Sequence, residues 1–145
     1  MIVEPGKTYV RRLRAVTAER DALALRLRLE RALAAADLHP PGLSPSAVLC
    51  VRKLTGRRAH ALLAAGGGAY ALADWQRAVA AAVEQLARHA ASPARGPVPA
   101  GAEAVIFRDQ AELLACLAAD CCEEAVPARW WWRSLFGGRG AAAAP

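Results

Sequence analysis

The amino-acid sequence predicts a small single α/β domain with a three-stranded sheet, about four helices and connectors rich in proline and glycine. Three observations support this fold class. The 145 residues match the length of one ordinary domain and are enough to bury a core without disulfide bonds. Short apolar runs near residues 10, 50 and 105 resemble strands in length and composition. Longer segments, beginning near residues 18, 74, 110 and 128, have the character of helices.

Three runs are predicted to form the sheet. Tyr9–Val16 contains valines and alternates imperfectly, so we expect a strand with arginines near its edges. Ala47–Leu54 is a continuous apolar run that ends in charge, as in a strand buried on both faces. Ala104–Phe107 is the third predicted strand. Because a helix separates the first two strands, we expect a right-handed crossover within one sheet.

The first helix is predicted over Ala18–Ala36. Its leucines alternate with other residues as in a strand, but the alanines and the absence of β-branching favour a helix. At about 100° per residue, Leu25 and Leu29 share one apolar stripe, whereas Leu23 and Leu27 lie on the opposite side. A second apolar spot on a helix indicates a second partner. Leu23 and Leu27 are therefore candidate partner-binding residues.

Three further helices are predicted. Asp74 is positioned to cap an amphipathic helix that carries apolar residues along one face. Asp109 and Glu112 form a capping box that opens a helix from Gln110 to about Cys122. Pro127 is suited to be the first residue of a short last helix. This helix is predicted to end near Phe136.

The domain is predicted to span residues 1–136. The connector at 92–101, rich in proline and glycine, is a possible joint between two lobes. The tail at 137–145 is predicted to be disordered. No segment approaches the roughly 18 consecutive apolar residues of a membrane span, and the N-terminus lacks an apolar signal-peptide core. We therefore expect a cytoplasmic protein with reduced cysteines.

Charge is distributed unevenly along the chain. The formal net charge is +6. Residues 1–58 contain 12 basic and 5 acidic side chains, and residues 59–145 contain 7 and 8. The region from Asp109 to Glu124 holds five carboxylates and no basic residue. This asymmetry suits nucleic acid, an anionic membrane or an acidic protein, but it also suits pairing within the molecule.

The sequence contains no pattern typical of a catalytic, metal or cofactor site. Gly6-Lys7-Thr8 resembles the end of a phosphate-binding loop, but it lacks the earlier glycine and the following helix. Cys116, Cys121 and Cys122 lie on one predicted helix and point about 100° to 140° apart, so they cannot converge on one tetrahedral ion. We expect Cys121 to pack in the core. No catalytic residue, metal or cofactor is predicted, and the protein is expected not to be an enzyme.

The segment Arg129-Trp130-Trp131-Trp132-Arg133 is the most unusual local feature. Three consecutive indoles on a helix cover about 200° of its surface, so they cannot all enter one core. In one interpretation, one or two of the indoles pack on the sheet and the third is half exposed. The other makes all five residues a partner-binding anchor, because Trp and Arg dominate interface hot spots. Replacing Trp131 and Trp132 with Ala is then expected to weaken partner capture while the fold is kept.

Several stretches together resemble a known group of proteins. They are Arg11–Arg14, Pro40–Leu43, Ala47–Leu54, Ala104–Phe107, Leu113–Leu117 and Trp130–Arg133. They resemble small proteins encoded in bacterial gene clusters for extracellular contractile injection systems, which are phage-tail-like particles. The resemblance implies an accessory or structural role with protein partners, and it implies no catalytic residue.

The predicted function is that of a non-enzymatic assembly or adaptor protein that binds protein partners. The alternative is a peripheral binder of nucleic acid or anionic membrane, driven by the N-terminal arginines. A third class, a thiol or metal enzyme, predicts zinc or iron in the purified protein.

Overall fold

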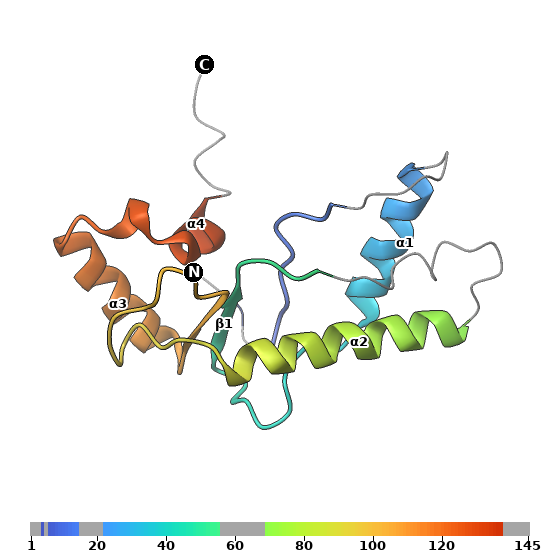
Figure 1. The fold of residues 1–145 in the computed structure, drawn as a ribbon, viewed down its shortest axis with the longest axis horizontal. Helices are drawn as coiled ribbons and strands as arrows, with labels where there is room; N and C mark the ends of the chain where they lie inside the picture. Colours follow the sequence, from blue (N-terminus) through green and yellow to red (C-terminus); the bar gives the residue numbers. More distant parts are fainter. Residues whose placement is uncertain (1–3, 5, 15–21, 56–68, 138–145) are drawn as a thin grey trace, which may run out of the picture. The chain divides into compact units, whose positions relative to one another are not determined.

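The computed structural model describes residues 4, 6–14, 22–55 and 69–137, with the backbone alone at 69–71. The chain forms two compact units (Figure 1). The first contains Pro41–Lys53 and Gln85 onward, together with Met1–Lys7; the second contains Thr8–Pro40 and Leu54–Glu84. The elements in chain order are α1 (Ala22–Ala35), β1 (Val48–Val51), α2 (Ala69–Arg88), β2 (Ala104–Phe107), α3 (Gln110–Cys122), the 3-10 turn η2 (Val126–Ala128) and α4 (Trp130–Phe136).

In the described residues the sheet has two antiparallel strands, so the prediction of three strands is wrong. Val48 lies opposite Phe107 and Cys50 lies opposite Val105. On the other edge of β2, the Ala104 carbonyl accepts from the Ala91 amide at 3.0 Å, and the Ala91 carbonyl accepts from the Ile106 amide at 2.9 Å. A single residue, and not a third strand, therefore covers that edge. A small mixed α/β protein remains the broad description.

The missing strand is the one expected at Tyr9–Val16. Residues 9–14 have no strand partner and are exposed, and the last two residues of the predicted strand lie outside the described residues. Arg11 and Arg12 are adjacent, so a strand here would place an arginine on each face. Burial of either face would then also bury a charged arginine, which explains why the run does not join the sheet. The prediction of a right-handed crossover to β1 is also wrong, because residues 9–14 do not form its first strand.

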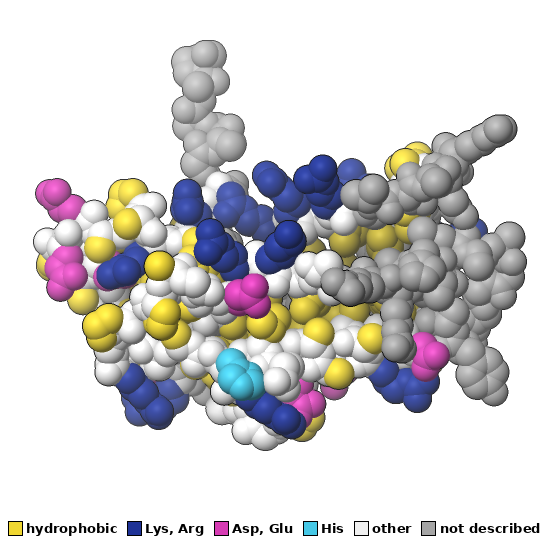
Figure 2. Space-filling view, viewed as in Figure 1, with side chains coloured by type: hydrophobic (Ala, Val, Ile, Leu, Met, Phe, Trp, Pro, Cys, Tyr) yellow, Lys and Arg dark blue, Asp and Glu magenta, His cyan; other side chains and the backbone are white. Residues whose placement is uncertain are grey.

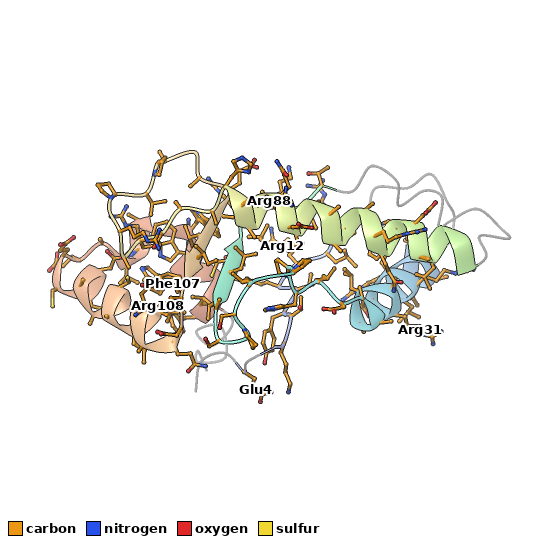
Figure 3. All side chains as sticks on the ribbon, turned by 90° about the horizontal axis from the view of Figure 1, so that it is seen from below. Glu4, Arg12, Arg31, Arg88, Phe107 and Arg108 are labelled. Atoms are coloured by element: carbon orange, nitrogen blue, oxygen red, sulfur yellow. The ribbon has the colours of Figure 1, made fainter. Side chains whose placement is uncertain are left out.

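The core of the first unit lies against one side of this sheet. It contains Val48, Cys50, Val105, Phe107, Leu113, Trp131 and Trp132. β1 is shorter than the predicted Ala47–Leu54, and its residues alternate between buried and partly buried. One face lies on the core, so the prediction of a strand buried on both faces is wrong. Phe107 and Leu113 have no exposed surface, and Figure 3 shows Phe107 among the side chains near α3. The sheet, α3 and α4 therefore share one apolar interior.

The start of α3 confirms the predicted capping box. The Asp109 carboxylate accepts from the Glu112 amide at 2.8 Å. The Glu112 carboxylate in turn accepts from the Arg108 amide at 2.6 Å, one residue before the cap. The first bond satisfies a donor that the first turn of a helix leaves unpaired, and the second pairs the amide before the cap in place of the cap's own amide. The predicted helix bounds, Gln110 to Cys122, are also confirmed.

The second unit contains α1 and most of α2. Leu25, Leu29 and Ala32 are buried on α1, in agreement with the predicted apolar stripe. Trp75, Val79 and Val83 are buried on α2. The Gln76 side-chain amide donates to the Ala32 carbonyl at 3.1 Å, which links the two helices.

Two helix starts differ from the prediction. Asp74 lies inside α2, which begins at Ala69, and its carboxylate pairs with Arg77 at 2.6 Å. The good helix formers Ala and Leu before Asp74 allow this earlier start. The last helix is divided, because Pro127 lies in η2 and α4 begins only at Trp130. Arg129 separates the two with an extended backbone (φ −96°, ψ 112°).

Among the described residues, every helix is too short or too polar to cross a membrane. The predicted joint at 92–101 lies within the first unit. Of the predicted disordered tail, residues 138–145 lie outside the described residues.

Candidate interaction surfaces

The tryptophan run is divided between the core and its margin. Trp131 and Trp132 are 3% and 1% exposed, whereas Trp130 packs at the edge of the core and is only partly buried. Trp132 stacks on Phe107 with ring centroids 5.5 Å apart, and Trp130 meets Trp131 edge-on at 5.7 Å. The helix α4 therefore presents two successive indoles to the interior.

A polar contact holds this arrangement. The indole nitrogen of Trp132 donates to the Asp120 carboxylate at 2.7 Å. The same carboxylate oxygen lies 3.9 Å from Nε of Arg129, whose guanidinium carbon lies 5.6 Å from the centroid of the Trp131 ring. Asp120 thus connects α3 to α4 at a site where its side chain is only 15% exposed.

These contacts change the interpretation of the Trp-Arg segment. Two of its three indoles are buried, so they cannot contact a partner while the first unit is folded. Removal of a buried tryptophan costs about 3–5 kcal/mol. Replacing Trp131 and Trp132 with Ala is therefore expected to unfold this unit. Arg129 and Trp130, both partly buried, and the exposed Arg133 are the parts of the segment that remain near the surface.

The clearest exposed apolar surface among the predicted residues is on α1. Leu23 and Leu27 are 66% and 45% exposed, although Leu25 and Leu29 on the opposite side are each 3% exposed. We call Leu23 and Leu27 the α1 strip. The structure thus separates the two predicted groups of candidates: Leu23 and Leu27 belong to the second unit and the Trp-Arg segment belongs to the first.

The N-terminal segment 6–14 is a second exposed surface. Tyr9 and Val10 are 63% and 51% exposed, and Arg12 and Arg14 are exposed beside them. Lys7, the lysine of the loop-like motif, pairs with Glu4. No helix follows this motif within residues 6–14, so the arrangement lacks the helix N-terminus that binds phosphate.

The cysteines occupy different environments. Burial raises the pKa of the Cys50 thiol to about 12. Desolvation, followed by the nearby charges of Glu112 and Asp120, raises the pKa of Cys116. Cys121 is exposed, so its predicted place in the core is wrong. In the described part of the chain, no three metal-ligating side chains come together.

One surface was missed in the sequence, namely the outer face of α3. Its exposed residues are Ala111, Leu114, Ala115, Ala118, Ala119, Cys121 and Cys122, none of which is charged. Figure 2 shows hydrophobic and acidic side chains together in the region where α3 lies. The signal was present in the sequence, because apart from Gln110, Glu112 and Asp120 this helix contains only apolar residues, which is more than one buried face requires.

Compared with protein-family models, with curated proteins and with solved structures, this chain has no match in any of the three. Inference about its function therefore depends on its own residues and contacts.

Proposed function

We propose that this protein is a non-enzymatic assembly or adaptor protein that binds a protein partner through the α1 strip. The observation that carries the proposal is the exposure of Leu23 and Leu27, at 66% and 45%, on a helix whose opposite face is buried. A pair of leucines one turn apart is the usual anchor of helix-mediated recognition.

The resemblance to proteins of contractile injection systems suggests which partner to seek. We propose a structural component of such a particle as the protein partner. The chemistry of the strip supports contact with an apolar helix face or shallow apolar surface, because two leucines offer area but no directional bonds.

Affinity capture from the native cell tests the proposal. The full chain, tagged, is compared with the Leu23→Gln/Leu27→Gln variant, and captured proteins are identified by mass. Gln has nearly the helix propensity of Leu, so the variant removes apolar area without weakening α1. We expect the variant to lose the specific partner.

Leu72→Gln is the matched control. Leu72 lies on α2 in the same unit and is 36% exposed, so its substitution removes a smaller exposed apolar surface from another helix. Equal capture by wild type, Leu72→Gln and the α1 variant would refute the proposed surface. Circular dichroism of each variant checks that the fold is kept.

A second candidate function is binding of an anionic polymer or membrane through residues 6–14. The exposed Arg12 and Arg14, beside the exposed Tyr9 and Val10, favour this alternative. Replacing both arginines with Gln is expected to reduce the salt dependence of nucleic-acid binding by a slope of about 2, if each contacts one phosphate. Absence of binding to nucleic acid and to anionic vesicles at low salt would exclude it.

A further inference from the structure

We propose that the α1 strip of one copy of this chain docks on the outer face of α3 in a second copy. This inference rests on the proposed function, because it names the occupant of the α1 strip.

The α1 strip continues into a charged residue. Leu23, Leu27 and Arg31 follow one another at four-residue spacing, so their side chains form a single ridge along the helix. All three are exposed, and Figure 3 shows Arg31 at the outer side of α1. A partner face that accepts this ridge must be apolar along most of its length and acidic at one end.

The outer face of α3 has this pattern. One row, at four-residue spacing, consists of Leu114, Ala118 and Cys122. The neighbouring row consists of Ala111, Ala115 and Ala119, and continues into Glu123. Small side chains on one helix allow the ridge of another helix to approach closely between two such rows. The face is therefore shaped for a leucine ridge.

Charge sets the direction of docking. Glu123 and Glu124, just beyond the end of α3, are exposed and make no ion pair within the described part of the chain. Arg31 on α1 is likewise exposed and makes none there, whereas Arg26 pairs with Glu30 at 2.9 Å. When the two helices run in the same direction, Arg31 meets the acidic end while the leucines cover the alanines.

The contact is small and is expected to be weak. One helix face on another buries less than the roughly 1,200 Å² that separates transient from standard interfaces. Self-association therefore depends on protein concentration, and its charged part weakens with salt.

The first test is a charge swap measured by sedimentation equilibrium of the full chain over a range of concentrations. We expect Arg31→Glu and Glu123→Arg, each alone, to weaken self-association about tenfold. The Arg31→Glu/Glu123→Arg double variant is expected to recover most of the wild-type association, because the opposite charges face one another again. Arg14→Glu, which makes the same change in net charge as Arg31→Glu at a residue that belongs to neither helix, is the control and should leave association unchanged.

The second test locates the contact. A chain with Leu27→Cys, Cys121→Ser and Cys122→Ser is mixed with a tagged chain that keeps its native cysteines. A short thiol-to-thiol crosslinker is added, and linked peptides are identified by mass. We expect links between position 27 of one copy and Cys122 of the other, about ten times more abundant than links from a Leu72→Cys control.

The inference would be overturned by a monomer at every concentration, by failure of the double variant to restore association, or by links from position 27 to Cys122 that are no more abundant than those from the Leu72→Cys control. A chain that stays monomeric, yet loses a cellular partner on Leu23→Gln/Leu27→Gln, would overturn this inference and leave the proposed function intact. Self-association that is weakened neither by Arg31→Glu nor by Leu23→Gln/Leu27→Gln would also overturn this inference.

Discussion

Asp120 is the residue through which α3 holds α4. It accepts the indole hydrogen of Trp132 at 2.7 Å, and it lies beside Arg129. The neighbouring indole is different, since Nε1 of Trp131 is buried and has no hydrogen-bond partner in the described part of the chain. Two equally buried tryptophans therefore differ in one polar contact, which makes their contributions to stability separable.

We predict that Trp132→Phe destabilises the first unit more than Trp131→Phe. Both substitutions remove similar apolar volume, but only the first breaks a hydrogen bond to a charged group, which is worth about 1.5–3 kcal/mol. Denaturant unfolding of the full chain measures the difference. Asp120→Asn, made in the wild type and in Trp132→Phe, is the control, because its effect should be smaller once the indole donor is absent. Equal losses for the two tryptophans would contradict the prediction.

We predict that the four thiols react in a fixed order in the folded protein at pH 8. The exposed Cys121 and Cys122 should be labelled first by a soluble alkylating reagent. Cys116 should follow, since its pKa is raised. Cys50, buried and with a pKa of about 12, should be labelled only after unfolding. Peptide mass spectrometry gives the order, and labelling of Cys50 as fast as Cys122 would contradict its place in the core.

At the scale of one element, α3 depends on its N-cap. The backbone hydrogen bond from Glu112 is the main cause that lowers the pKa of Asp109, and Arg108 adds to it. Because the folded-state pKa lies below the ordinary value of 3.8, the charged cap stabilises the folded form fully above that value. This contribution is lost as pH falls through the lower, folded-state pKa.

We therefore predict that Asp109→Asn reduces the acid sensitivity of the first unit. Asn caps a helix about as well as Asp but does not titrate in this range. The variant should match wild type closely at pH 7 and lose less stability between pH 5 and pH 2, roughly where an unfolded Asp is protonated. Thermal unfolding across this pH range measures the effect. Asp109→Ala should lower the melting temperature at every pH. If the melting temperatures of Asp109→Asn and wild type fell by the same amount as the pH is lowered, the prediction would be contradicted.

At the scale of the whole molecule, the chain contains two units whose buried residues come from different elements. The first is built on β1, β2, α3 and α4, and the second on α1 and α2. Cooperative units with separate interiors open separately in hydrogen exchange.

We predict that Leu29→Ala loosens the second unit and leaves the first unchanged. Leu29 is 3% exposed, and Leu→Ala at a buried site costs about 2–5 kcal/mol. Hydrogen exchange of the full chain should show faster exchange of α1 amides and unchanged exchange in β1 and β2. Leu23→Ala, at a 66% exposed position on the same helix, is the matched control and should alter neither. Equal acceleration in the strands would show that the units open together.

Local patterns in the sequence were sufficient for many of the elements. The bounds of β2, the capping box of α3 and the buried stripe of α1 were all predicted and confirmed. Each depends on residues within one or two turns of one another, so the physical cause lies within the segment itself. The exposure of Leu23 and Leu27 follows from the same periodicity.

The tertiary structure alone decided how distant segments pair. The valines near residue 10 have the composition of a strand, but adjacent arginines prevent burial of either face, and β1 pairs with β2 instead. Three consecutive indoles could not be sorted from the sequence. Trp132 is buried because Asp120, on another helix, offers its carboxylate and Phe107, on a strand, offers its ring. Periodicity specifies the face of a helix, whereas the partner of that face is determined by contacts between residues far apart in the chain.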